Sequence, residues 1–194
     1  HASYMNLLTG LCSHEELNRI AYFAKSLERE HGVKVLSATI TDVPSCVGTL
    51  PMVLARSGVR YFAQGINGDR GPFFWSATVQ SPFYWEGPDG SKVLAWLTPG
   101  YAQMPGLGLM SSCHAVYTRL AGFLQGYDRE DYPYDAVLVY GAFGDNGGFD
   151  DRFAVVAAEW NAKWAYPKLA LARDEEFFEH IEKSFADKVP TFKG

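Results

Sequence analysis

Apolar side chains recur at spacings of three and four residues in several stretches of the chain, and this periodicity predicts amphipathic helices. The stretches are residues 14–31, 48–57, 114–127, 151–165 and 174–185. The first stretch carries signals at both ends, because Ser13 is a typical N-cap and Gly32 a typical C-cap. Asp174 is a candidate cap for the last stretch.

Short β-rich runs lie between the helical stretches and predict strands. These runs are residues 33–40, 61–64, 92–97, 136–140 and 169–172. Because several of them are apolar at both alternating positions, they suit strands that are buried on both faces of a parallel sheet. Helices and strands alternate along most of the chain, which predicts an α/β fold with right-handed crossovers.

The stretch from about residue 67 to 112 interrupts this alternation and is interpreted as an aromatic-rich insert. Its first part is rich in Gly, Pro and aromatic residues, and Asp89-Gly90 predicts the tight turn of a hairpin. Residues 101–112 contain several Gly and Pro, and we expect a mobile loop there.

Composition narrows the class of protein. The length of 194 residues suits about one domain, and the 47% apolar content argues against bulk disorder. The net charge of -5 disfavours a nucleic-acid partner. No apolar run reaches the about 18 residues of a membrane span, so we expect a soluble chain. Aromatic residues are abundant at 15%, which suits either sugar stacking or a dense core.

Two carboxylates follow predicted strands, at the positions where an α/β fold usually builds its active site. Asp42 comes just after the run 33–40, and Asp145 comes just after the run 136–140. Two carboxylates on one face of a sheet suit glycoside hydrolysis, with one as nucleophile and the other as acid and base. A structural interpretation also stands, in which Asp42 caps the next helix and Asp145 belongs to a turn.

Other candidate residues are polar or aromatic side chains of the insert. Arg70, in the polar loop 67–71, is a candidate to bind a sugar hydroxyl or to orient Asp42. Trp75, Tyr84 and Trp85 are candidates to stack on a sugar ring, although packing beneath the insert explains them equally well.

Several short runs together carry a family resemblance. They are residues 6–12 (Asn-Leu-Leu-Thr-Gly-Leu-Cys), 41–44 (Thr-Asp-Val-Pro), 50–51 (Leu-Pro), 57–62 (Ser-Gly-Val-Arg-Tyr-Phe), 82–85 (Pro-Phe-Tyr-Trp), 90–94 (Gly-Ser-Lys-Val-Leu), 140–141 (Tyr-Gly), 145–146 (Asp-Asn), 160–161 (Trp-Asn) and 177–178 (Phe-Phe). With these runs the chain resembles the catalytic domain of glycoside hydrolase family 38, which comprises the α-mannosidases and their bacterial relatives. The resemblance covers nearly the whole chain and is strongest over residues 6–97 and 135–165.

The resemblance implies a fold and a mechanism. It implies part of a distorted seven-stranded α/β barrel with mostly parallel strands, formed by residues 1–194 as a partial catalytic domain. It implies a zinc ion beside a catalytic Asp that is both nucleophile and metal ligand, and Asp42 matches that position. Asp145 is the match for the acid/base, and Asn146 beside it is expected to bind the carbohydrate substrate.

The chain also departs from the family pattern. Better-known mannosidases carry Asp-Pro-Phe-Gly-His-Ser where residues 42–47 read Asp-Val-Pro-Ser-Cys-Val, which indicates a divergent branch. The family's His-x-Asp of the first strand and its downstream His have no match here. We therefore expect the remaining zinc ligands outside this chain, which would be an internal piece of a longer enzyme and inactive alone. The chain begins with His1 rather than Met, so an upstream signal peptide could be missing and the location stays open.

Three alternatives remain beside an α-mannosidase-like activity. A non-catalytic carbohydrate-binding or structural module can use the same scaffold, because a fold does not fix a function. A deacetylase-like hydrolase would need closely spaced His ligands, which the chain lacks. The same mechanism can also serve another sugar.

Overall fold

The computed structural model describes residues 1–43, 46–67, 80–141, 147–148 and 150–194 of the chain. These residues form two compact units. The first, called the sheet unit, comprises His1–Gly100 and Asp174–Gly194, and the second, called the helical unit, comprises Tyr101–Arg173.

A five-stranded sheet organises the sheet unit. Its strands are β1 (Ser37–Asp42), β2 (Tyr61–Ile66), β3 (Phe83–Glu86), β4 (Lys92–Thr98) and β5 (Thr191–Lys193). The order is β1-β2-β4-β3-β5, and three of the four neighbouring pairs are parallel. The exception is the antiparallel pair β3–β4, whose tight turn contains Gly90 in the left-handed region at φ 80°. The predicted hairpin at Asp89-Gly90 is therefore confirmed.

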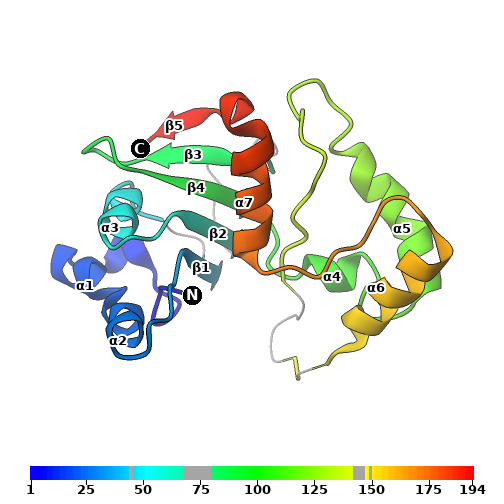
Figure 1. Ribbon diagram of the computed structural model, residues 1–194, viewed down its shortest axis with the longest axis horizontal. Helices are drawn as coiled ribbons and strands as arrows, with labels where there is room; N and C mark the ends of the chain where they lie inside the picture. Colours follow the sequence, from blue (N-terminus) through cyan, green and yellow to red (C-terminus); the bar gives the residue numbers. More distant parts are fainter. Residues whose placement is uncertain (44–45, 68–79, 142–146, 149) are drawn as a thin grey trace. The chain divides into compact units, whose positions relative to one another are not determined.

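Helices cover both faces of this sheet (Figure 1). On one face, α1 (His14–Arg19), α2 (Tyr22–His31) and α3 (Leu50–Arg56) enclose an apolar core, which Phe62 of β2 enters from the sheet. On the other face lies α7 (Asp174–Phe185), where Phe178 stacks on Tyr61 with ring centroids 5.3 Å apart. The unit also contains two short 3-10 turns, η1 (Thr9–Leu11) and η2 (Ala186–Lys188).

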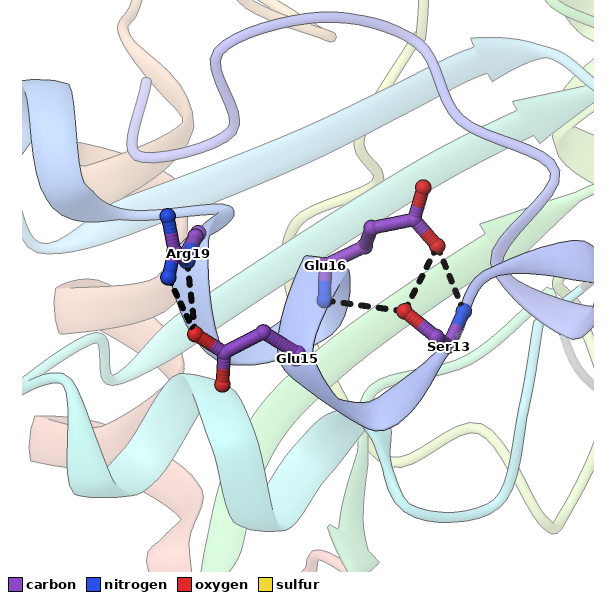
Figure 2. A network of polar contacts seen from close by, with 4 residues as sticks. All are labelled: Ser13, Glu15, Glu16 and Arg19. Atoms are coloured by element: carbon purple, nitrogen blue, oxygen red, sulfur yellow. Dashed lines mark hydrogen bonds and ion pairs between the residues drawn. The ribbon is translucent and has the colours of Figure 1, made fainter.

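The predicted helix 14–31 is divided into α1 and α2. Its beginning is as expected, because Ser13 and Glu16 form a reciprocal capping box (Figure 2). The end is also as expected, with Gly32 in the left-handed region at φ 68°. The break falls at Ile20, whose carbonyl accepts a hydrogen bond from the Tyr4 amide. A backbone segment distant in sequence thus contacts the helix where it is interrupted.

The helical unit contains α4 (Gln103–Gly106), α5 (Cys113–Gln125) and α6 (Arg152–Lys163). Its core is formed by α5, α6 and the turn before α5, with Leu109, Val116, Val156 and Trp160 among the buried residues. The side chain of Ser112 caps α5 by accepting a hydrogen bond from the Ala115 amide. The segment expected to be a mobile loop, residues 101–112, contains the short helix α4.

Two predicted strands are wrong, because residues 136–140 and 169–172 form no strand in the described structure. The Tyr140 amide donates to the side chain of Gln103, and the Tyr140 carbonyl accepts from the Gln103 amide. The side chain of Asn161 bonds both the amide and the carbonyl of Leu169. These backbone groups are therefore paired with helix residues rather than with a neighbouring strand.

The α/β class and the mostly parallel strands are thus confirmed. The described residues form one open sheet of five strands, so they do not confirm the seven-stranded barrel that the resemblance implies. Among the helices described, none is both long and apolar enough for a bilayer crossing.

Candidate functional site

Three parallel strands end together at one edge of the sheet. The register aligns Asp42 of β1 with Ile66 of β2, and Gly65 of β2 with Thr98 of β4. Asn67, directly after β2, forms an antiparallel bridge with Gly100. The carboxyl ends of β1, β2 and β4 therefore form a common edge, the location at which α/β proteins bind ligands.

Asp42 occupies this edge in an unusual backbone conformation. Its φ is 72°, and among the described residues it is the one non-glycine residue with positive φ. Asp tolerates this left-handed conformation better than most residues, yet it still costs about 1–2 kcal/mol. Strained residues of this kind concentrate at active and binding sites. The side chain of Asp42 is exposed, so its carboxylate can meet a ligand.

The backbone and the carboxylate of Asp42 are both bonded to Asn67. The Asn67 amide donates to the Asp42 carbonyl at 3.3 Å, and Nδ2 of Asn67 donates to Oδ1 of Asp42 at 3.1 Å. One residue earlier, the Thr41 amide donates to the side chain of Asn6 at 2.9 Å. The end of β1 is therefore fixed from two directions.

A buried polar pair supports the same edge from the face that α3 covers. Gln64 is only 2% exposed, and its Nε2 donates to the carbonyl of Val43 at 2.9 Å. The Cys46 thiol donates in turn to Oε1 of Gln64 at 2.8 Å. Burial raises the pKa of Cys46 to about 12, which suits a thiol that donates a hydrogen bond.

The sequence did not single out Asn67, Gln64 or Cys46 as site residues. Asn67 was only the first residue of a polar loop in which Arg70 was preferred. A polar residue inside an apolar strand, as Gln64 is, is the signal that could have been used, because buried polar groups require partners.

Four of the predicted site residues, Asp145, Asn146, Arg70 and Trp75, lie outside the described residues. Their roles stay predictions, as does the separation between the carboxyl groups of Asp42 and Asp145.

The two other aromatic candidates, Tyr84 and Trp85, lie toward the opposite end of the sheet. In the sheet register, Tyr84 of β3 pairs with Leu94 of β4, and Leu94 pairs with Tyr61 of β2. Tyr61 pairs in turn with Ser37 at the start of β1. Asp42 ends that strand, about 16 Å further along at about 3.3 Å per residue. The structure therefore does not bring these aromatics together with Asp42.

Trp85 is a core residue in this arrangement. Its side chain is 2% exposed, its ring centroid lies 5.7 Å from that of Phe62, and its Nε1 donates to the carbonyl of Gly194. Burial favours the packing interpretation of Trp85 over sugar stacking. Tyr84 is half-buried on the α7 side, and desolvation raises its pKa.

A complete zinc site is absent from the part of the chain that the structure describes, since no three His, Cys, Asp or Glu side chains converge there. Asp42 supplies one carboxylate at the strand edge. A zinc site takes three or more protein ligands, so the described residues do not fit a resident zinc without further ligands.

A shallow, open pocket lies in the helical unit between α5 and α6. It is lined by Cys113, His114, Tyr117, Lys163 and Trp164. The rings of Tyr117 and Trp164 are stacked there with centroids 5.8 Å apart. Its lining lacks the carboxylate that hydrolysis would need, so the strand edge at Asp42 is the stronger candidate.

Comparison with known proteins identifies the type of domain. The family model described as "Glycosyl hydrolases family 38 N-terminal domain" matches residues 18–194. The fold is similar to that of an alpha-mannosidase from Enterococcus faecalis V583, with a TM-score of 0.76 and 17% identity. That match covers 100% of this chain but only 21% of the mannosidase chain, so this chain spans about one fifth of its length. No curated protein matches the sequence.

Proposed function

The chain belongs to the glycosyl hydrolase family 38 N-terminal domain family, and from this premise we propose that it works within a longer, retaining glycosidase for α-mannoside-like bonds. The observation that supports this proposal best is Asp42 itself. It is an exposed carboxylate at the carboxyl edge of a parallel sheet, in a strained conformation and oriented by Asn67. The family resemblance implies that Asp42 matches the family's nucleophile.

In the proposed first step, an oxygen of the Asp42 carboxylate attacks the anomeric carbon. The bond from that carbon to the leaving oxygen breaks, while the carboxyl group of Asp145 gives its proton to the leaving oxygen. A glycosyl-enzyme ester on Asp42 results, with the anomeric configuration inverted once.

In the second step, the Asp145 carboxylate takes a proton from water, and the water oxygen attacks the anomeric carbon. The ester bond breaks and Asp42 returns as a carboxylate, so the sugar leaves with its original configuration. The proposal requires the two carboxyl groups to lie about 5–5.5 Å apart in the enzyme.

Zinc dependence is part of the proposal, with Asp42 as one ligand and the others outside the described residues. When bound, zinc would supply charge and would orient sugar hydroxyls. The steps above are written for the side chains alone, because the described residues do not complete a metal site.

The test uses the full-length enzyme with an aryl α-mannoside. Compared with wild type, Asp42→Asn should lose activity by roughly 10³-fold or more, because the nucleophile is removed. The matched control is Asp187→Asn, which makes the same change at an exposed position in η2 and should keep wild-type activity. A chelator should abolish wild-type activity, and added zinc should restore it.

Two outcomes would contradict the proposal. Wild-type activity in a folded Asp42→Asn variant would remove Asp42 from the mechanism. A folded, zinc-loaded wild type that cleaves no member of an aryl glycoside panel would indicate a non-catalytic carbohydrate-binding or structural module instead.

A further inference from the structure

The side chain of Asn67, directly after β2, bonds to the carboxylate of Asp42 at the end of the neighbouring strand β1. Its Nδ2 donates to Oδ1 at 3.1 Å, within the normal range for a hydrogen bond. A carboxylate oxygen only accepts, so the amide nitrogen of Asn67 must be the donor. Among the described residues, this is the one hydrogen bond made to the Asp42 carboxylate, and Oδ2 receives none.

Asn67 is itself held in place by backbone contacts on both sides. Its amide donates to the carbonyl of Asp42 on β1, and its bridge to Gly100 connects it to the chain after β4. Side chains that a rigid framework holds in this way can orient a reacting group more narrowly than a residue on a free loop.

From this geometry we infer that Asn67 is a positioning residue for the nucleophilic attack by Asp42. The inference rests on the proposed role of Asp42 as nucleophile. An exposed carboxylate rotates about its Cβ–Cγ bond, and a fixed donor on Oδ1 restricts that rotation. The other oxygen is then presented to the anomeric carbon in one orientation, which reduces the entropy that attack must lose.

The chemical type of Asn67 suits this role. A charge-assisted hydrogen bond from a neutral amide fixes a carboxylate without adding a cation beside it. Arg70, expected to bind a sugar hydroxyl or to orient Asp42, lies outside the described residues, and Asn67 makes the contact that the structure describes.

The side chain of Asn67 can be tested separately from its backbone. Asn67→Asp has nearly the same shape, keeps the backbone amide that bonds to Asp42, and replaces the Nδ2 donor by an acceptor that also carries negative charge. Asn67→Ala removes the donor without adding a charge. Asn67→Gln keeps a primary amide on a side chain that is one methylene longer. The matched control is Asn18→Asp, which makes the same chemical change at an exposed position of α1.

The measurement is covalent trapping on the full-length enzyme. A fluorinated mannosyl fluoride that forms the ester and hydrolyses slowly is mixed with each variant, and intact mass spectrometry follows the labelled fraction with time. Peptide mapping then identifies the labelled residue. The rate constant at saturating probe reports attack by Asp42, and the final amplitude reports the fraction of folded enzyme.

We expect Asn67→Ala to lower the trapping rate constant by roughly 10- to 100-fold, the effect of losing a hydrogen bond to a charged group and its alignment. Asn67→Asp should lower it at least as far, because a second carboxylate then lies beside Asp42. The probe concentration that gives half of the maximal trapping rate should stay near the wild-type value, because the contact is made to the nucleophile rather than to the sugar. Asn67→Gln should recover part of the rate, and Asn18→Asp should match wild type.

The possible failures are distinguishable. If wild type is not labelled on Asp42, the proposed function fails. If wild type is labelled on Asp42 and Asn67→Ala reacts with the same rate constant, the positioning role is overturned. A merely structural role would lower the labelled amplitude of Asn67→Ala while the remaining enzyme reacts at the wild-type rate, which also overturns the inference.

Discussion

The stretches predicted as strands satisfy their backbone polar groups differently in the sheet unit and in the helical unit. In the sheet unit, β2 lies between the parallel strands β1 and β4, and its six residues are all buried. Its amides and carbonyls pair with neighbouring strands. In the helical unit, the side-chain amides of Gln103 and Asn161 bond the backbone of Tyr140 and Leu169, in two segments whose apolar pattern predicts strands.

This difference separates burial from strand pairing, two properties that an apolar pattern does not distinguish. Val139 and Leu169 pack against the core of the helical unit, and Tyr140 is only 8% exposed. The pattern therefore correctly indicated that these positions contact the core, although Leu171 of the same run is 54% exposed. A strand also needs a neighbouring backbone at the right distance, and a side-chain amide can take that place because it carries the same donor and acceptor groups.

The largest effect that would test this comparison is expected at Gly141, next to the segment of Tyr140. Gly141 has φ 78°, and a Cβ there would overlap the carbonyl oxygen of Tyr101. Gly141→Ala should therefore destabilise the helical unit by about 2 kcal/mol or more. The measurement is the free energy of unfolding of the full-length protein, with hydrogen exchange assigning the loss to α5 and α6.

The matched control for Gly141→Ala has the opposite expected sign. Gly122 lies inside α5, and a Cβ there would meet nothing within 4 Å. Gly122→Ala should stabilise the helical unit by about 0.5–1 kcal/mol, because alanine has the higher helix propensity. Equal effects of the two substitutions would mean that the close approach of Gly141 to Tyr101 is not a feature of the folded protein.

The sequence predicted elements best where the signal is local. The bounds of α7 agree with the predicted 174–185, and the Ser13 cap and the Gly32 end of α2 are where expected. Capping residues and glycines act within one helical turn, so their effect can be read without knowing the fold.

Features that depend on distant contacts were not predictable in this way. β5 has three exposed residues and is a strand because it pairs with β3, about a hundred positions earlier in the chain. The Tyr4 amide bonds to the carbonyl of Ile20 at the break before α2, and no pattern within residues 14–31 contains that contact.

The candidate site also combines a residue that a local signal predicts with one that depends on a distant contact. Asp42 was predictable because it directly follows a β-rich run, and such positions lie at the carboxyl edge of a parallel sheet. Asn67 was not, because its contact with Asp42 depends on the register that aligns Asp42 with Ile66. A one-residue shift of that register would move Asn67 away from the carboxylate.

A smaller effect is expected at Asn161, which bonds the backbone of Leu169 at 2.7 and 2.9 Å. Asn161→Ala should destabilise the helical unit by about 1–2 kcal/mol, because two hydrogen bonds are lost at a position where water can replace them in part. Asn161→Asp keeps the acceptor for the Leu169 amide but loses the donor, so it should cost less.

Chemical denaturation of the full-length protein measures both Asn161 variants. If Asn161→Ala left stability unchanged, the amide would not be what holds residue 169 out of a strand. The contrast between the two units would then need another explanation, such as the packing of Leu169 alone.

The smallest effect is expected at Asp89, where a side chain of the sheet unit bonds the backbone of a tight turn. Asp89 accepts hydrogen bonds from the hydroxyl and the amide of Ser91 and pairs with Arg56, and these contacts lower its pKa to about 2. Because the folded pKa lies below the ordinary value, the stabilisation is present above about pH 4 and is lost as the pH falls toward 2. Asp89→Asn should therefore lower the urea midpoint slightly at pH 5, and the difference from wild type should vanish near pH 2. A difference that persists unchanged at pH 2 would show that the substitution acts through something other than the charge of Asp89.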